Sequence, residues 1–205
     1  MPIFLPKLSE MEHDLLTELF NIGIGGAANS LSQLVNQEIV LSVPSLQFKT
    51  SSQVIDQLGK NKKLFAIAQE MEGPFAMHSL LIFNPEDGFE VVKRMLGPHL
   101  SDETLAELQS EALTEIGNIV LNACIAVVSE ALGQGFDIHL PIFSSTIPED
   151  LLAENADGDS DCLLAIEVKL ELKESAINGY LLFILNTDSI ENLQKTLASL
   201  LDNLQ

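Results

Sequence analysis

The feature that most constrains how this chain folds is an internal repeat. When the sequence is displaced by 97 positions, residues 14–44 align with residues 111–141, and eight of the 31 aligned positions are identical. About two identities are expected by chance at this composition. The identical pairs include Thr17 with Thr114, Glu18 with Glu115, Asn21 with Asn118, Ile22 with Ile119 and Pro44 with Pro141. We infer a tandem duplication, with copies over about residues 9–100 and 101–205.

The similarity between the copies continues more loosely downstream. The segment LFAIAQEME at residues 64–72 resembles LLAIEVKLE at residues 163–171. The segment HSLLIF at residues 78–83 resembles GYLLFI at residues 179–184. Each copy is therefore expected to contain the same elements in the same order, namely a long helix, a short strand, a β-hairpin and a closing helix.

The long helix of each copy has recognisable start and stop signals. Ser9 followed by Glu12 has the pattern of a capping box, and leucines and isoleucines then recur on one side to about Val35. In the second copy the same helix is expected over about residues 111–132, ending at Gly133. A separate acidic helix over about residues 101–110 is expected to link the two copies.

Strand and turn signals occupy the remainder of each copy. A strand over residues 38–43 is expected to stop at Pro44, and its counterpart over residues 136–140 to stop at Pro141. The other expected elements are a hairpin of residues 64–71 with 76–83, a helix after Asn84 that ends before Gly97, a hairpin of residues 163–170 with 176–185, a closing helix from Thr187, and loops or short helices over residues 51–63 and 146–161.

These elements define the fold class as α/β. Each αβα copy would be marginally stable alone and would leave unpaired strand edges. Joining the copies across a pseudo-twofold axis removes both problems. We therefore expect one domain over residues 1–205, with an antiparallel-rich sheet of about six strands and helices on the outside.

The composition limits which partners the protein can bind and in which cellular compartment it is expected. The chain has 10 basic and 30 acidic residues, a net charge of −20, and Arg94 is its only arginine. Neither nucleic acid nor an anionic membrane is expected to bind, and a partner with a basic surface is favoured. Cys124 and Cys162 lie in apolar segments without metal-ligand spacing, which indicates a reducing compartment. No secretory or membrane-spanning segment is evident, so we expect a cytoplasmic protein. We also expect the protein to be a monomer.

Each long helix is predicted to have a polar stripe opposite its apolar side. At about 100° per residue, the stripe of the first helix contains Asp14, Glu18, Asn21 and Gly25. The matching stripe of the second helix contains Glu111, Glu115, Asn118 and Asn122. The residues expected to face inward are Leu15, Leu16, Leu19, Ile22, Ala27 and Leu34 in the first helix, and Leu113, Ile116, Ile119, Val120, Ala123 and Val127 in the second.

A single Glu-x-x-Asn pattern is most simply the solvated side of an amphipathic helix. Here both copies keep the pattern at the same offset from a threonine before it and a proline after it. Core packing explains a repeated leucine, but it does not explain a repeated exposed asparagine, whose side chain disfavours helix interiors. The repeated pattern therefore indicates a functional site in each copy.

The residues of the two stripes resemble the signature of the CheC, CheX and FliY family of response-regulator phosphatases. The two copies read Asp14-x3-Glu18-x2-Asn21-x22-Pro44 and Glu111-x3-Glu115-x2-Asn118-x22-Pro141. The second copy departs from the signature at Glu111, where the family usually has Asp or Ser. Two signatures over nearly the whole chain resemble CheC. CheX has one signature and dimerises, and FliY has an additional switch-complex domain that we do not expect here.

The resemblance implies hydrolysis of the aspartyl phosphate on a CheY-like receiver domain. Asn21 and Asn118 would orient the attacking water, and Glu18 and Glu115 would pair with the receiver's active-site lysine. The supporting positions of the signature are Asp14, Glu111, Pro44 and Pro141. The resemblance places a magnesium ion on the receiver's own carboxylates, so we expect no metal site or cofactor in this chain.

Two other interpretations stay open at this point. One is a non-catalytic adaptor that binds a receiver or the deamidase CheD, and the other is an unrelated structural α/β pseudodimer. The intact Glu and Asn of both copies favour catalysis. Residues 23–26, Gly-Ile-Gly-Gly, faintly resemble a phosphate loop, but they lie inside a helical pattern, so close approach by a neighbouring helix or by the partner is the preferred reading. Cys124 is expected in the core, and the four histidines on the surface or in packing contacts.

Overall fold

The computed structural model describes residues 5–35, 38–73, 77–97, 99–133, 135–155, 163–172, 175–185 and 187–203. The helices are α1 (Glu10–Val35), α2 (Ser51–Leu58), α3 (Pro85–Leu96), α4 (Asp102–Leu132), α5 (Pro148–Asn155) and α6 (Thr187–Asn203). The strands are β1 (Ile39–Lys49), β2 (Leu64–Glu72), β3 (Met77–Phe83), β4 (Asp137–Ile138), β5 (Ile142–Thr146), β6 (Leu163–Leu172) and β7 (Ser175–Leu185). Three of the sequence predictions, those for Ala76, residues 156–161 and Cys162, lie outside the described residues.

The strands form one sheet, and every described pair is antiparallel. The strand order is β1-β6-β7-β3-β2-β4, and β5 also pairs with β2. Exchanging each strand with its counterpart in the other copy turns this order into its own reverse, because β1 corresponds to β4 and β5, β2 to β6, and β3 to β7. The first strand of each copy pairs with the hairpin of the other copy, so the copies are intertwined. The predicted α/β fold class is confirmed.

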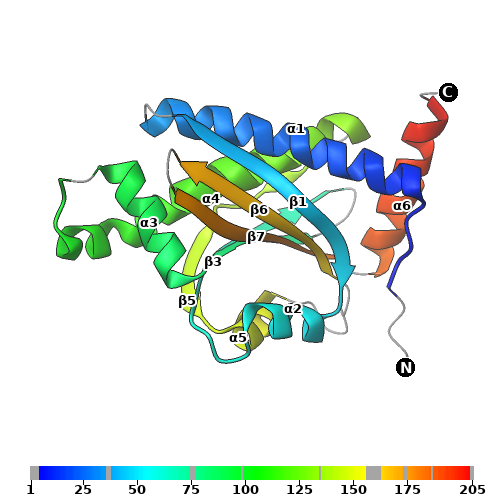
Figure 1. Ribbon diagram of the computed structural model, residues 1–205. Helices are drawn as coiled ribbons and strands as arrows, with labels where there is room; N and C mark the ends of the chain where they lie inside the picture. The colour runs from blue at the N-terminus through cyan, green and yellow to red at the C-terminus, as the bar shows by residue number, and fades with distance from the viewer. Residues whose placement is uncertain are drawn as a thin grey trace.

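Helices cover both faces of the sheet (Figure 1). The long helices α1 and α4 lie over one face together with α3 and α6, and the larger cluster of buried side chains fills the space between. The short helices α2 and α5 cover the other face through a second cluster. Strand β2 shows the alternation: Ile67 and Met71 face the long helices, whereas Leu64 and Ala66 face the short ones.

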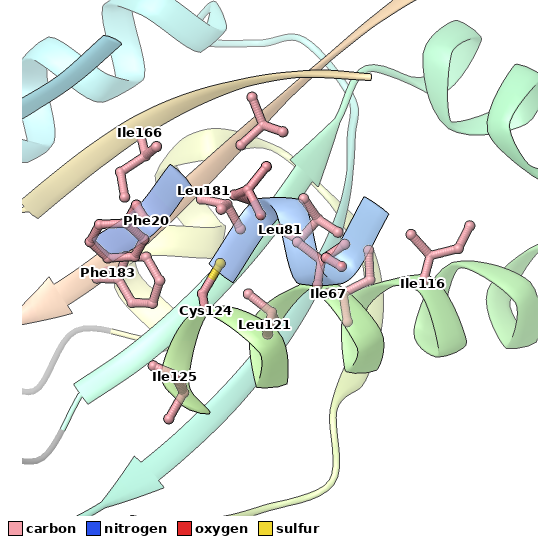
Figure 2. Close-up of a cluster of buried hydrophobic side chains, with 14 of the residues drawn as sticks. Phe20, Ile67, Leu81, Ile116, Leu121, Cys124, Ile125, Ile166, Leu181 and Phe183 are labelled. Carbon is pink, nitrogen blue, oxygen red and sulfur yellow. The ribbon is translucent and has the colours of Figure 1, made fainter. Parts of the chain in front are cut away.

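The larger cluster gives the long helices a close-packed base. Phe20 of α1 contacts Phe183 of β7, with ring centroids 5.2 Å apart. Figure 2 shows Leu121 and Cys124 of α4 beside the strand residues of the same cluster. Fully burying a leucine or phenylalanine side chain stabilises a fold by roughly 1.5–3 kcal/mol. The outer faces of α1 and α4 are therefore held on a rigid layer.

Cys124 is fully buried, which confirms the prediction that it belongs to the core. Burial raises the pKa of its thiol to about 12, because the thiolate would lose its hydration in this apolar setting. The thiol is therefore neutral at physiological pH and acts as a small apolar side chain.

The predicted capping box of α1 is confirmed, but the predicted division of the second long helix is wrong. The Glu12 amide donates to Ser9 Oγ at 3.3 Å, and the Ser9 amide donates to Glu12 Oε2 at 2.7 Å. Residues 101–110 do not form a separate helix, because α4 is continuous from Asp102 to Leu132. Leu105 is fully buried on the same side as the later apolar residues, so no physical signal interrupts the helix.

The inward-facing residues of α1 are predicted only in part. Ile22 and Leu34 are about half exposed, with relative accessibilities of 53% and 50%. The buried side of α1 is centred on Phe20 and Ile24, which face the sheet and α4. Ile22 lies two residues from each, about half a turn away around the helix, so it points outward.

One described helix has the length and apolar composition of a membrane-spanning segment, namely Asp102–Ala131 within α4. Half of its most apolar window is buried inside the fold, and its apolar side packs on the sheet and on α1. This burial is what a core helix requires. The cytoplasmic location, the monomeric state and the domain limits expected from the sequence remain predictions.

Strand β1 does not stop at Pro44 as the sequence analysis predicted. It continues to Lys49, and its pairing with β6 shifts register between Ser42 and Ser45. Because β1 is an edge strand, a residue without an N–H group is tolerated at such a bulge. Proline therefore distorts this strand without ending it.

The second copy is interrupted at the matching place. Residues 139–141 separate β4 from β5, and β5 was not predicted. In each copy one extra residue is inserted opposite the partner strand: residues 43–44 lie opposite Val168, and residues 139–141 lie opposite Gln69 and Glu70. The two prolines thus mark equivalent irregularities, and Gln69 and Val168 occupy equivalent positions.

The hairpin and helix-end predictions are confirmed. β2 pairs with β3, and β6 with β7, each as an antiparallel hairpin. Asn84 caps α3 by accepting a hydrogen bond from the Asp87 amide, and Gly97 ends that helix with a φ of 103°. Gly133 ends α4 with a φ of 63°, a left-handed conformation that favours glycine.

Candidate functional site

The first candidate site lies on the side of α1 that faces away from the sheet. We call Asp14, Glu18 and Asn21 site one. All three side chains are exposed, as the polar stripe predicted. Within the part of the chain that the structure describes, Asp14 has its carboxylate 3.8 Å from His13 Nδ1, and the side chains of Glu18 and Asn21 make no hydrogen bond. None of the described residues therefore holds the amide of Asn21 through a hydrogen bond.

The second candidate site, site two, consists of Glu111, Glu115 and Asn118 on α4. Glu111 and Glu115 are exposed, but Asn118 is partly buried and its amide is hydrogen bonded. Asn122 Nδ2 donates to Asn118 Oδ1 at 2.8 Å. Gln69 Nε2 of β2 in turn donates to Asn122 Oδ1 at 3.2 Å. The asparagine of site two is thus tethered to the sheet, whereas that of site one is not.

Gln69 is the residue that sequence reasoning missed. Its side chain is only 1% exposed, and its Nε2 also donates to the backbone carbonyl of His139 at 3.0 Å. The alternation of β2 places it on the same row as Ile67 and Met71, which face the long helices. A polar residue on a core-facing row, matched by Val168 in the other copy, was a signal present in the sequence.

The repeated threonines have a structural role that is the same in both copies. Thr17 Oγ1 donates to the carbonyl of His13 at 2.8 Å, and Thr114 Oγ1 donates to the carbonyl of Ser110 at 2.7 Å. Each bond reaches back one helical turn on the flank of the stripe. These identities are therefore explained by the local backbone, whereas the repeated Glu and Asn make no equivalent contact.

The two long helices approach closely between the sites. A Cβ atom added to Gly23 would lie 2.8 Å from the Cα atom of Cys124, so α1 and α4 pack backbone to backbone there. By contrast, a Cβ atom at Gly25 or Gly26 would meet nothing within 4 Å. The glycine-rich run is thus part of a helix, with one glycine at the helix contact and two facing open space.

A groove of about 550 Å³ lies beside the other face of the sheet, lined by α2 residues, the start of α3 and β7, and it contains none of the stripe residues. Among the described residues no group of three His, Cys, Asp or Glu side chains is arranged to hold a metal ion. Exposed carboxylates and carboxamides on a helix surface are suited to contact another macromolecule.

The fold and the paired sites define a class: an intertwined α/β duplication with a Glu-x-x-Asn on the outer side of each long helix. Residues 11–47 match the model of the CheC-like family. The chain is 23% identical to the CheY-P phosphatase CheC of Bacillus subtilis, over 91% of this chain and 93% of CheC. It is 28% identical to the flagellar motor switch phosphatase FliY of the same organism, over 82% of this chain but only 44% of FliY.

Three solved structures share the fold. FliY of Thermotoga maritima superposes with a TM-score of 0.77 at 18% identity, covering 95% of this chain and 99% of that one. CheX in the Borrelia burgdorferi CheX-CheY complex superposes with a TM-score of 0.50 at 20% identity, covering 80% and 96%. FliM in a FliG-FliM complex of H. pylori gives 0.65 at 15% identity, covering 92% and 100%. The chain is therefore similar to the CheC, CheX and FliY family in sequence over residues 11–47 and in fold over most of its length.

Proposed function

We propose that this chain is a phosphatase that hydrolyses the aspartyl phosphate of a CheY-like response regulator in chemotaxis signalling. The observation that supports this most is that Glu18 with Asn21, and Glu115 with Asn118, stand at equivalent places on the outer faces of α1 and α4. The chain's relatives include a protein named CheY-P phosphatase CheC and one named flagellar motor switch phosphatase FliY. A CheY-like receiver as the partner is consistent with the CheX-CheY complex, whose CheX shares this fold.

The reaction needs little covalent chemistry from the protein. The oxygen of a water molecule bonds to phosphorus, the bond from phosphorus to the aspartyl oxygen breaks, and the receiver regains its carboxylate while inorganic phosphate takes the water's proton. An acyl phosphate is labile, so a catalyst has chiefly to place the water in line. Asn21 and Asn118 are proposed for this task, because a neutral carboxamide orients water without repelling the phosphoryl oxygens.

The glutamates are proposed to fix the docking of the receiver. Glu18 and Glu115 lie three residues before the asparagines, so each stands about one helical turn away on the same exposed face. A carboxylate there can pair with a lysine of the receiver's active site. The magnesium ion of the reaction is proposed to be the receiver's own, and this chain is proposed to supply no metal and no cofactor.

The competing function is that of an adaptor that binds a receiver, or the deamidase CheD, without catalysis. The two functions are separated by measuring phosphate release and binding on the same samples. A panel of receivers phosphorylated by a small phosphodonor is mixed with the protein, and inorganic phosphate is followed against each receiver's own rate of loss. We expect at least one receiver to be dephosphorylated faster. Binding of receivers with an unchanged phosphate lifetime would establish the adaptor and refute the phosphatase.

A further inference from the structure

Three carboxamide side chains are hydrogen bonded in a row that begins at a buried strand residue and ends at Asn118. Gln69 donates to Asn122 at 3.2 Å, and Asn122 donates to Asn118 at 2.8 Å. Gln69 is 1% exposed, whereas Asn122 and Asn118 are partly buried. Two side-chain hydrogen bonds therefore connect the proposed water-orienting amide of site two to a buried anchor.

The backbone carbonyl of His139 sets the direction of both hydrogen bonds that link Gln69, Asn122 and Asn118. The carbonyl of His139 only accepts, so the amide group of Gln69 must turn its Nε2 toward it, at 3.0 Å. The same Nε2 faces Asn122, which must then present its Oδ1. Asn122 is left with Nδ2 toward Asn118, so Asn118 must present its Oδ1. Reversing Gln69 would place its Oε1 against the carbonyl oxygen of His139.

The break in the strand at Pro141 is what makes this carbonyl available. Residues 139–141 carry the extra residue between β4 and β5, so His139 lies outside the regular ladder. The amide of His139 still donates to the carbonyl of Glu70 at 3.0 Å, and its Nδ1 lies 3.3 Å from Glu70 Oε2. His139 is thereby held beside β2 with its carbonyl toward Gln69. The strand interruption that contains Pro141 thus includes the carbonyl to which Gln69 donates.

The outcome is a fixed orientation for Asn118. Its Oδ1 is occupied by Asn122, and its Nδ2 makes no hydrogen bond with the described residues. The NH2 group is thus the end left to donate to a phosphoryl oxygen, which only accepts, while the second lone pair of Oδ1 can still accept from the attacking water. Fixing a side chain before the substrate arrives removes an entropy cost from the reaction step.

Site one keeps the asparagine but lacks both residues that hold it in site two. Gly25 stands at the position of Asn122, and the strand position of Gln69 is occupied by Val168, which is 5% exposed. A valine at that position can neither donate nor accept a hydrogen bond. The two copies therefore differ at both positions of the hydrogen-bonded link, and not at a single residue.

We propose that Gln69 and Asn122 are positioning residues that hold Asn118 in its working orientation, so that site two is preorganised and site one is not. This inference rests on the proposed function, since it concerns how one of the proposed catalytic residues is placed. Its two members act through Asn118 and do not touch the receiver's phosphoryl group.

The test isolates each site by removing the other asparagine. In an Asn21→Ala background only site two operates, and in an Asn118→Ala background only site one operates. Gln69→Leu and Asn122→Ala are introduced into both. In the site-two background each is expected to lower kcat about tenfold with KM within about twofold, and combining them is expected to lower kcat little further, because they break one connection. In the site-one background neither is expected to change kcat.

Several outcomes would overturn the proposal: unchanged kcat in the site-two background, an effect confined to KM, or equal losses in both backgrounds, which would mark a general loss of structure. Thermal melting of each variant shows whether the fold is intact. A readout independent of activity is the mobility of the side-chain amides by NMR. The Asn118 NH2 group is expected to be rigid in the natural protein and mobile in Gln69→Leu, with the Asn21 NH2 group mobile in both.

The NMR readout separates the two possible failures. In one case the Asn118 amide is rigid and becomes mobile in Gln69→Leu, but the protein has no phosphatase activity. This result would refute the proposed function, and the fixed orientation of Asn118 would then have no catalytic role. A mobile Asn118 amide in an active phosphatase would refute the positioning of Asn118 and leave the proposed function standing.

Discussion

The outer faces of α1 and α4 descend from one duplicated helix, yet they present the same two residue types in different physical states. On α1 the Asn21 amide is exposed and unrestrained by the described residues, and beyond it lie Gly25 and Gly26 with open space around them. On α4 the Asn118 amide is tied through Asn122 to the buried Gln69. The comparison shows that a repeated motif does not guarantee a repeated site, because the residues behind the motif have diverged.

The effect that follows most directly from this difference is an unequal loss of activity when each asparagine is replaced. Asn118→Ala is expected to lower total turnover about fivefold, and Asn21→Ala by less than about twofold, because a fixed carboxamide holds the attacking water better than a mobile one. Initial rates of phosphate release at saturating receiver measure both losses. Equal losses would remove the asymmetry, and a larger loss from Asn21→Ala would reverse it.

The next effect concerns docking, for which the two sites are expected to be alike. Glu18→Lys combined with Glu115→Lys is expected to raise KM for the receiver about tenfold at low salt, because an attraction to the receiver's lysine becomes a repulsion between exposed charges. The effect should shrink as salt is added. A KM that does not change at low salt would contradict the role of the glutamates. Glu10→Lys combined with Glu103→Lys, at one exposed residue on each helix outside the two sites, changes the net charge by the same amount and is the control.

A third prediction concerns the contact that joins the two helices. Gly23→Ala is expected to destabilise the fold by about 2 kcal/mol, because the new Cβ atom would lie 2.8 Å from the Cα atom of Cys124. Gly25→Ala is the matched control, and it is expected to stabilise the fold by about 0.5–1 kcal/mol, since its Cβ atom meets nothing within 4 Å. Urea unfolding measures both. A neutral Gly23→Ala would show that the helices can separate without cost.

The smallest expected effect comes from making site one resemble site two at one position. Gly25→Asn, in the Asn118→Ala background, places an amide at the counterpart of Asn122, where an added Cβ atom meets nothing within 4 Å. Its turnover is expected to change by less than about twofold, because Val168 offers no hydrogen bond to anchor the new side chain. A clear gain in turnover would show that a pair of asparagines suffices and that the buried glutamine is dispensable.

Much of the fold could be predicted because the signals are local or repeated. Capping residues such as Ser9 and Asn84 act within one turn, and the hairpins have strong alternation and short connections. The repeat then indicated how strand edges are covered. The sequence could not distinguish one continuous α4 from a linker helix followed by a second helix. The copies align only from residue 14 onward, and the sequence alone does not show that Leu105 is buried.

The parts that could not be predicted depend on contacts distant in the sequence. Pro44 was expected to end a strand, but pairing with β6 on both sides of the bulge carries β1 past it. Ile22 was expected to face inward, but the direction of the buried side of α1 is set by the position of α4 and the sheet. The link between Gln69 and Asn122 spans 53 residues, and no pattern in either segment pointed to the other.

We propose above that Asn21 and Asn118 catalyse hydrolysis of the receiver's aspartyl phosphate. The most direct test of this proposal is phosphate release from a phosphorylated receiver by the Asn21→Ala/Asn118→Ala variant, measured beside its melting temperature and its affinity for the receiver. Both substitutions lie on helix surfaces, and alanine is the better helix former, so the fold should be retained. The account predicts a folded variant that still binds the receiver and leaves its phosphate lifetime unchanged. Acceleration equal to that of the natural protein would contradict it.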